Sequence, residues 1–401
     1  MSRAKTETPN IDTVAVRGGE PRSHAYHSVS MPIACSATYA FEDTRAIQEH
    51  LAGRAERREY GRYANPTVEV AEQKLAALDG AQAAVLFPSG MNAVTTLLLA
   101  MLRPGDHIVL TKDLYRRTRQ FVVSVLARYG IEHTFIEPDD LQAAASALAR
   151  PRTRLLLTEA PSNPYLRIVD VARMAELATA ARAKLVVDAT LATPFNFRPL
   201  AHGAHLVLHS CTKYLGGHND LLAGVLCGSA PLIDALREAR GLFGGMPDAH
   251  AAYLLIRGLK TLHVRMRQHN QSGLAIATFL ERHPRVKRLY YPGLPSHPDH
   301  AVAQRTFTGF GGVISFRLAA DGVTTSRFLD QCQIATIGAS MGAVETLVQQ
   351  PAALAHAELS PEERAAIGAF DDLVRLSVGL EHVDDLIADL DQALAAAFSG
   401  E

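Results

Sequence analysis

Short apolar runs alternate with longer amphipathic stretches from about residue 66 to residue 260. The runs Ala83–Phe87 and Leu185–Val187 are typical of buried strands, and the stretches Asn92–Leu102 and Val171–Arg182 are typical of helices. Strands that alternate with helices form βα units, which build a mainly parallel sheet. Further strands are predicted at His107–Leu110, Arg154–Thr158 and Ala204–His209, and further helices at Glu69–Leu78 and Phe121–Tyr129.

The pattern differs on either side of this α/β stretch. Residues 1–65 are polar and irregular, and their helix-like run Ala46–Glu59 mixes both charges, which favours a solvated face or a subunit contact. After a long helix in pieces, Ala249–Phe279, come a strand, Gly312–Leu318, and helices at Thr325–Cys332 and Val383–Ala396. We therefore predict an arm over 1–65, a large α/β domain over 66–260 and a smaller α+β domain over 261–401.

Charge and composition exclude several classes of partner. The 401 residues carry 40 Lys and Arg against 41 Asp and Glu, so the near-neutral chain has no general attraction to nucleic acid or to anionic membranes. No apolar leader lies in the first thirty residues, and no apolar run approaches the roughly 20 residues of a membrane span. The four cysteines are far apart. These features predict a soluble, cytoplasmic protein without a disulfide framework or a cysteine-rich zinc module.

Polar residues follow two of the predicted strands where a small ligand could bind. Open α/β sheets bind ligands at the carboxyl ends of their strands. Pro88–Met91 is a Ser-Gly turn that leads into a helix, and its free N–H groups suit a phosphate, although this segment taken alone favours an ordinary tight turn. Asn163, in the turn Glu159–Pro164, either serves that turn or points its amide into a site.

Two further strand ends carry more reactive groups. Asp188 directly follows the strand Leu185–Val187, and the sequence after it is a poor helix start, which favours a functional carboxylate over a helix cap. Lys213 stands among small hydroxyl residues after the strand Ala204–His209, where burial would lower the pKa of its amine and make it a nucleophile. Ser210 and Thr212 could offer hydroxyl groups to a phosphate.

A phosphate cradle, an amine, a carboxylate and an amide on neighbouring strand ends are the set that pyridoxal phosphate needs. Its aldehyde forms a Schiff base with a lysine, and its pyridinium nitrogen pairs with a carboxylate.

Two alternative kinds of site, a zinc site and a nicotinamide site, are weaker. Histidines capable of binding zinc cluster around a predicted strand, where i and i+4 side chains lie too far apart to share one metal ion, so no metal is predicted. They are His202, His205, His209 and His218. A nicotinamide dehydrogenase needs a GxGxxG motif after the first strand, and none is present.

Together these residues resemble the pyridoxal-phosphate enzymes of cysteine and methionine metabolism, the group of cystathionine synthases, cystathionine lyases and methionine γ-lyases. The similarity runs from about Pro32 to Leu394. Six segments carry it: Tyr60–Thr67, Ser89–Met91, Pro161–Pro164, Val187–Asp188, His209–His218 and Arg257–Leu262. The resemblance implies a fold-type I, aspartate aminotransferase-like fold with a mainly parallel sheet and a smaller α+β C-terminal domain.

The resemblance also implies a role for each matching residue. Lys213 would hold the cofactor covalently and later move protons, Asp188 would pair with the pyridinium nitrogen, and Tyr115 would stack on the ring and assist proton transfer. The phosphate would be held by Gly90, Met91, Ser210 and Thr212, and by Tyr60 and Arg62 of a neighbouring subunit. The family's usual assembly is a homotetramer whose active sites are shared within a dimer.

Substrate contacts follow from the same resemblance. Arg375 would clamp the substrate carboxylate with help from Ser340, and Asn163 would lie beside the cofactor's phenolate oxygen and that carboxylate. Ala339 stands where many synthases and cystathionine lyases have glutamate, which weakens the case for cystathionine itself as the substrate. The run Met341–Ala343 replaces the family's usual Leu-Gly-Gly or Phe-Gly-Gly, which indicates a reshaped substrate pocket. Arg116 and its neighbours Arg117 and Arg119 either read an anionic group on activated homoserine or form a solvated helix face.

Plant-type cystathionine γ-synthases share the most motifs with the chain. They are Glu59–Tyr63, Asp113–Thr118, Leu208–Ser210, His218–Asp220 and Tyr291–Pro298. The predicted activity is therefore γ-replacement on an O-activated homoserine by a thiol such as cysteine. Alternatives are γ-elimination from methionine, canavanine or cystathionine, and sulfhydrylation of an O-acylhomoserine. An inactive scaffold is disfavoured because Lys213, Asp188, Tyr115 and Arg375 are all present.

Overall fold

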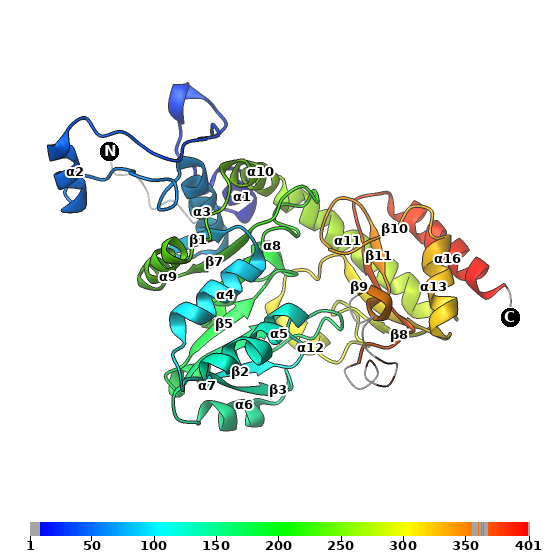
Figure 1. Ribbon diagram of the computed structural model, residues 1–401. Helices are drawn as coiled ribbons and strands as arrows, with labels where there is room; N and C mark the ends of the chain where they lie inside the picture. The colour runs from blue at the N-terminus through cyan, green and yellow to red at the C-terminus, as the bar shows by residue number, and fades with distance from the viewer. Residues whose placement is uncertain (1–8, 355–359, 361, 363, 365–367, 400–401) are drawn as a thin grey trace, which may run out of the picture.

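A computed structural model of the chain describes residues 9–354, 360, 362, 364 and 368–399, so the extreme ends of the predicted first and third segments lie outside it. Its described residues form two sheets, of seven and of five strands. Figure 1 shows the larger sheet with its helices beside the smaller sheet, and α11 (Leu262–Arg282) running between them. No helix of the described part of the chain is long and apolar enough to cross a membrane.

The seven strands of the larger sheet follow the order β1-β7-β6-β5-β4-β2-β3. In chain order their bounds are β1 Ala83–Phe87, β2 His107–Thr111, β3 Glu132–Ile136, β4 Thr153–Glu159, β5 Lys184–Asp188, β6 Leu206–Ser210 and β7 Gly224–Gly228. Neighbours from β3 to β6 are parallel, and β7 is antiparallel to both β1 and β6. The predicted mainly parallel sheet is confirmed, with β3 and β7 as strands that the sequence pattern did not reveal.

Helices cover both faces of this sheet and bury an apolar cluster on each. On one face α3 packs on β1 and β7; on the other, α4 packs on β6 and β7. The helices up to α11 are α1 Ile11–Arg17, α2 Thr44–Leu51, α3 Pro66–Asp79, α4 Gly90–Met101, α5 Arg116–Ser124, α6 Leu141–Leu148, α7 Val171–Ala180, α8 Thr193–Asn196, α9 Ala230–Phe243 and α10 Ala249–Leu259. Short 3₁₀ turns span Ala25–His27, Leu126–Tyr129 and Pro199–His202.

Local chemistry explains where the helices begin and end. Asn65 caps α3 by accepting the backbone N–H of Thr67 at 2.9 Å, and Pro66 occupies the first turn, where its missing N–H costs no helical bond. The helix ends at Gly80, whose φ of 68° is left-handed and free of strain only for glycine. Ser89 caps α4 in the same way, by accepting the N–H of Asn92 at 3.0 Å. This cap holds the turn after β1 at the sheet edge.

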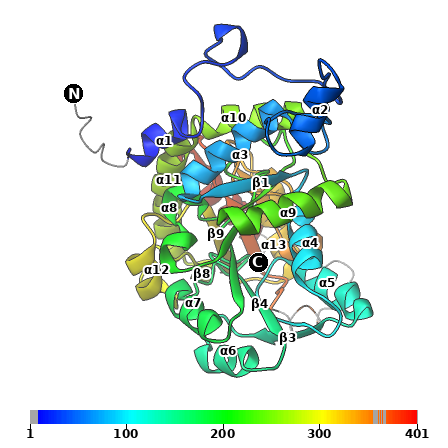
Figure 2. The ribbon, with the colours of Figure 1, turned by 90° about the vertical axis from the view of Figure 1, so that its left-hand side faces the viewer.

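The smaller sheet has the order β10-β11-β12-β9-β8. Its strands are β8 Val286–Tyr290, β9 Val313–Leu318, β10 Thr336–Ile337, β11 Leu347–Gln349 and β12 Leu373–Ser377. Its helices are α12 His300–Thr306, α13 Gly322–Gln331, α14 Pro351–Leu354 and α16 Val383–Phe398. The part of the chain between α1 and α3 carries α2 and projects from the body of the molecule in both views, whereas α1 packs on α3 and α11 (Figures 1 and 2).

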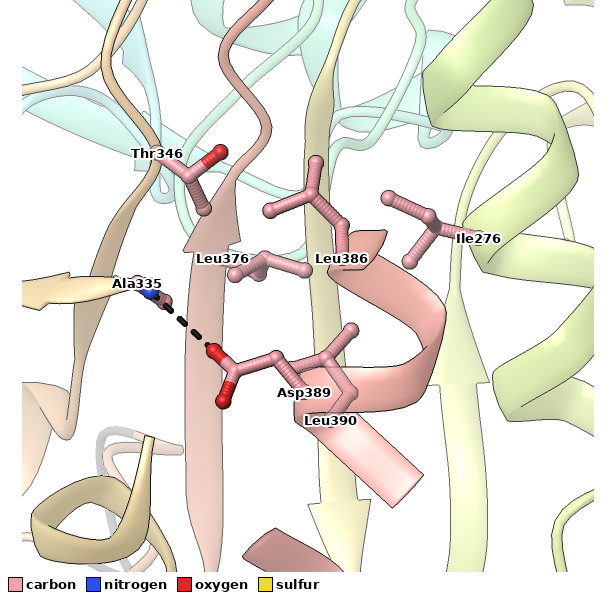
Figure 3. Close-up of a pocket in the computed structure, with 7 residues that line it drawn as sticks. All are labelled: Ile276, Ala335, Thr346, Leu376, Leu386, Asp389 and Leu390. Atoms are coloured by element: carbon pink, nitrogen blue, oxygen red, sulfur yellow. Dashed lines mark hydrogen bonds between the residues drawn. The ribbon is translucent and has the colours of Figure 1, made fainter. Parts of the chain in front are cut away.

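Asp389 of α16 stabilises the turn that precedes β10. Its buried carboxylate accepts the backbone N–H groups of Gln333 and Ile334, both at 2.8 Å, and of Ala335 at 3.2 Å. Figure 3 shows this carboxylate aimed at Ala335 beside an apolar cluster that includes Leu386. Burial opposes ionisation, but the three N–H donors outweigh it and lower the pKa of Asp389.

We expect Asp389→Ala to lower the free energy of unfolding by about 2–4 kcal/mol, because three buried N–H groups lose their acceptor. Urea unfolding measures the loss, and Asp391→Ala, an exposed carboxylate on the same helix, is the matched control. Since the folded state lowers this pKa, the contribution of Asp389 is present above the unfolded pKa and disappears as the pH falls through the folded one. The free energies of unfolding of the two variants should therefore differ least at acidic pH. A difference that stays constant with pH would contradict an ionised Asp389 in the folded state.

Candidate active site

The carboxyl ends of β4, β5 and β6 bring the predicted site residues to one edge of the larger sheet. Glu159 and Asp188 are register partners at the ends of β4 and β5, and Ser210 ends β6. The turn after β1 reaches the same edge through α4, because a Cβ on Gly90 would lie 3.1 Å from the Cβ of Ser210. A side chain at Gly90 would therefore fill the space beside the Ser210 hydroxyl.

Lys213 lies in the turn that follows β6 and points toward the smaller sheet. Its Nζ donates a hydrogen bond of 2.7 Å to Oγ of Ser340. Burial lowers the pKa of Lys213, and the nearby positive charge of Arg375 lowers it further, to about 8. About a tenth of the amine is therefore unprotonated at pH 7, far more than for an ordinary lysine, and the unprotonated form is the nucleophile toward a carbonyl.

Arg375, on β12, brings the smaller sheet into the site. Its guanidinium donates to Oδ1 of Asn163 at 3.3 Å and to the carbonyl oxygen of Ser340 at 2.9 Å, and it also bonds Oε1 of Gln349. Burial lowers its pKa to about 10, and among the described residues it forms no ion pair with a carboxylate. A buried cation held only by neutral groups is suited to bind a carboxylate supplied by a ligand.

Ser340 connects the lysine and the arginine. Its hydroxyl meets Lys213, its carbonyl meets Arg375, and its φ of 88° is left-handed, which is strained for a residue other than glycine. Such strain is characteristic of functional sites, where the surrounding structure holds the residue in place. Ala339, the preceding residue, is exposed, so its methyl group adds no charge to this part of the site.

Asp188 has one carboxylate oxygen already engaged. Its Oδ1 accepts the backbone N–H of Thr190 at 3.0 Å and the hydroxyl of Thr190 at 2.5 Å. Burial raises the pKa of Asp188, while the two hydrogen bonds from Thr190 and the charge of His209 oppose this rise. His209 itself is fully buried, with Nε2 3.0 Å from Oδ2 of Asp79.

Tyr115 lies at the start of α5, with its side chain 46% exposed. Its backbone N–H donates to Oε2 of Glu159 at 2.8 Å. Burial raises the pKa of Glu159 well above its usual range, and the neighbouring carboxylates of Asp188 and Asp113 raise it further. The sequence interpretation did not include Glu159 among the site residues; the available signal was an acidic residue at the end of a strand that is otherwise buried.

The remaining phosphate-binding candidates lie close to the same edge. Thr212 accepts the backbone N–H of Ala223 at 3.2 Å, which fixes its side chain beside the turn of Lys213. Met91, in the first turn of α4, accepts a weak hydrogen bond from Thr118 of α5 at 3.8 Å. The helix α4 is twelve residues long, and it begins in the turn after β1 with free N–H groups and its positive dipole end. This arrangement is suited to bind a phosphate.

Arg265 is a second residue that sequence reasoning missed. This buried side chain on α11 donates to the carbonyl oxygen of Tyr214 at 2.6 Å and to that of Gly258 at 2.7 Å. Tyr214 follows Lys213, and its hydroxyl accepts the N–H of Gly312 at 2.9 Å. The lysine turn is thus held to α10 and α11 from its far side. The only sequence signal for this role was an arginine at a position of α11 that the helical periodicity places on the buried face.

Tyr60 and Arg62 have contacts within the arm. Tyr60 pairs with Thr38 in a short antiparallel bridge, and the guanidinium of Arg62 lies over the rings of Tyr60 and Tyr63, 5.4 and 5.0 Å from their centres. In the described chain these contacts do not connect them to Lys213 or Asp188. Tyr60 is 44% exposed.

The arginines after Tyr115 all interact with their own surroundings. Arg119 donates to the carbonyl oxygen of Lys112 at 3.1 Å and lies over the ring of Phe135, and Arg117 donates to Gln120 at 2.7 Å. Arg116 is half-buried at the start of α5, beside Tyr115.

The four histidines of the zinc alternative do not converge. His205 accepts the backbone N–H of Leu185 at 3.1 Å, His209 pairs with Asp79, and His218 bonds the carbonyl oxygen of Gly216 at 2.8 Å. In the part of the chain that the structure describes, no three His, Cys, Asp or Glu side chains group as metal ligands.

Comparison with known proteins agrees with this geometry. Residues 12–395 match the model of the family described as Cys/Met metabolism PLP-dependent enzyme. Cystathionine gamma-synthase 1, chloroplastic, of Nicotiana tabacum is 44% identical over 95% of this chain and 71% of its own length. L-methionine gamma-lyase of Pseudomonas putida is 39% identical over 97% of this chain and 98% of its own length. The crystal structure of metB from Corynebacterium glutamicum superposes with a TM-score of 0.90 at 37% identity, covering 97% of this chain and 98% of that one. The predicted fold class is confirmed.

Proposed function

Because the chain belongs to the pyridoxal-phosphate-dependent enzymes of cysteine and methionine metabolism, we propose that it replaces the γ-substituent of an O-activated homoserine by a thiol such as cysteine. The observation that carries the proposal is the bridge at Ser340. It places an amine of lowered pKa and an arginine that has no carboxylate partner among the described residues on two sides of one residue. An amine beside a carboxylate-binding cation is the arrangement that an amino-acid substrate needs.

The residues at the sheet edge fit the cofactor of this family. Asp188 keeps Oδ2 for the ring nitrogen because Thr190 engages Oδ1. Gly90 and Met91 begin α4, Ser210 lies beside Gly90, and the phosphate would bind there with help from Thr212. Tyr115 would cover the ring, and Asn163 would contact its phenolate oxygen. When bound, pyridoxal phosphate supplies an electron sink that makes the α- and β-protons of an amino acid removable.

Each chain residue then has a defined task. Arg375 orients the substrate by its carboxylate, which turns the α-proton toward Lys213. Nζ of Lys213 removes that proton, and Oγ of Ser340 holds the amine between transfers. Removal of a β-proton would then expel the γ-substituent with its bonding electron pair and leave a β,γ-unsaturated substrate. A thiolate would attack its γ-carbon if one is held there and water is kept out, and the two protons would return to the α- and β-carbons.

A γ-lyase is the second candidate, and Ala339 favours it. An exposed methyl group beside Ser340 provides no charge to recognise the distal amino group of cystathionine, so the site also suits methionine, canavanine or another substrate with a less polar end. The similarity to methionine gamma-lyases agrees with this candidate. An O-acylhomoserine sulfhydrylase would use the same residues with a smaller thiol. Arg116, next to Tyr115, is the proposed reader of an anionic activating group.

We further propose a homotetramer in the cytoplasm, in which the arm over residues 1–65 completes the site of a neighbouring copy. The large domain over 66–260 would supply the cofactor site, and the domain over 261–401 would supply Arg375. The arm exposes apolar and aromatic side chains, among them Val29 at 76%, Leu51 at 72% and Tyr63 at 48%. Exposed apolar side chains on a projecting segment are expected to pack on a second copy.

The decisive experiment gives the purified, cofactor-loaded protein acetyl-, succinyl- and phospho-homoserine, methionine and canavanine, each with and without cysteine. Mass spectrometry identifies the products, and Lys213→Ala is the inactive control. We expect cystathionine from one activated homoserine only when cysteine is present. Oxobutanoate or homoserine from methionine or canavanine, independent of cysteine, would make the protein a lyase. No turnover of any substrate would contradict both candidates.

A further inference from the structure

Thr190 forms a hydrogen-bonded link between the ends of β5 and β6. Its hydroxyl oxygen accepts the backbone N–H of Ser210 at 2.8 Å and lies 2.5 Å from Oδ1 of Asp188. A threonine hydroxyl has one proton to donate. Because the Ser210 N–H approaches a lone pair, that proton is directed to Asp188, and the backbone N–H of Thr190 donates to the same oxygen at 3.0 Å.

This link fixes the carboxylate in one orientation. Two donors on Oδ1 prevent rotation of the carboxyl group, so Oδ2 is the oxygen left for a ligand. Other titratable groups face Asp188 from both neighbouring strands: Glu159 on β4, which would repel its charge, and His209 on β6, which would stabilise it. The bonds from Thr190 act directly on Asp188 and favour its ionised form.

We propose that Thr190 is a positioning residue, which holds Asp188 ionised and oriented so that Oδ2 pairs with the ring nitrogen of the cofactor. The inference rests on the proposed placement of that ring nitrogen at Asp188. Thr190 acts through Asp188 and does not itself touch the substrate. Its bond to Ser210 also ties the carboxylate to the turn that carries the phosphate-binding hydroxyls, so both ends of the cofactor site share one support.

A competition between two cofactors tests this role. The holoenzyme is dialysed to equilibrium against a mixture of pyridoxal phosphate and the analogue in which carbon replaces the ring nitrogen, and mass spectrometry gives the ratio bound. Thr190→Val removes the hydroxyl at nearly constant shape, and Thr190→Ser retains it. Thr96→Val on α4 is the matched control, since Thr96 is also buried and its hydroxyl has no partner among the described residues.

We expect the wild type, Thr190→Ser and Thr96→Val to prefer pyridoxal phosphate equally. Thr190→Val should lower this preference roughly tenfold or more, the effect of one hydrogen bond to a charged group. A purely structural role would weaken binding of both cofactors alike and leave the ratio unchanged, which would overturn the inference. If Thr190→Val does not fold, Thr190→Ala gives the same comparison. A wild type that does not distinguish the two cofactors would instead overturn the proposed placement of the ring nitrogen.

Discussion

Lys213→Ala lowers kcat by roughly 10³-fold or more, because the same amine is expected to bind the cofactor and to transfer the α-proton. The variant should fold, since it loses one hydrogen bond, from Nζ to Ser340, and the packing of one side chain next to the site. Steady-state kinetics with the substrate identified in the panel measures the loss, and urea unfolding checks the fold. Lys287→Ala, at an exposed lysine of β8, is the control and should retain full activity. Retention of more than a tenth of the activity by Lys213→Ala would exclude this lysine as the proton carrier.

The lowered pKa of Lys213 adds a pH dependence to this prediction. Only the unprotonated amine attacks the cofactor aldehyde, and below a pKa of about 8 its fraction falls tenfold for each pH unit. The rate at which cofactor-free protein captures pyridoxal phosphate should therefore rise with pH and level off above about pH 8, as followed by stopped-flow absorbance. A rise that continues to pH 10 would show that neither burial nor Arg375 lowers this pKa.

Lys213→Ala also tests whether two copies share a site. If Arg62 acts on the neighbouring copy, each site combines Lys213 of one chain with Arg62 of the other. Co-expression of Lys213→Ala with Arg62→Ala, each of low activity alone, should then restore about a quarter of the sites in randomly mixed dimers. Activity no higher than the average of the two single variants would place Lys213 and Arg62 in the same site of one chain, or Arg62 outside the site.

The second large effect is expected for Arg375→Lys. A lysine keeps the positive charge but cannot bond a carboxylate through two parallel N–H groups, and it leaves Asn163 and Gln349 without their donor. We expect kcat/KM to fall by roughly 10²-fold, mainly through KM, which corresponds to about 3 kcal/mol of lost binding. Arg317→Lys is the matched control on β9, the neighbouring strand, where the arginine pairs with Asp372 and not with the site.

Substrate esters distinguish loss of carboxylate binding from general damage. The wild type should prefer the free amino acid over its methyl ester, and Arg375→Lys should reduce this preference because the bidentate partner is gone. Equal losses for the acid and the ester in Arg375→Lys would mean that the arginine supports the fold of the site without binding the carboxylate. Arg317→Lys should retain the wild-type preference, even if its free energy of unfolding falls.

Local patterns predicted most helices and strands of the larger sheet. The strand β1 has the predicted bounds Ala83–Phe87, and α3 and α4 begin within three residues of their predicted starts because their caps are short-range signals. The strand β7, Gly224–Gly228, was missed because five residues that begin and end in glycine carry little pattern of their own. Its antiparallel pairing with β1 and β6 comes from long-range contacts.

The sequence by itself determined the chemical groups of the site, because Lys213, Asp188 and the Ser89–Met91 turn each follow a strand, and parallel strands end at one edge. Only the tertiary structure decided how those groups are supported. The contact of Lys213 with Ser340 spans 127 residues of chain, and the contact of Arg375 with Asn163 spans 212. Thr190, Glu159 and Arg265 each form a hydrogen bond with the backbone of another segment, and a partner of that kind leaves no residue-specific signal in the sequence.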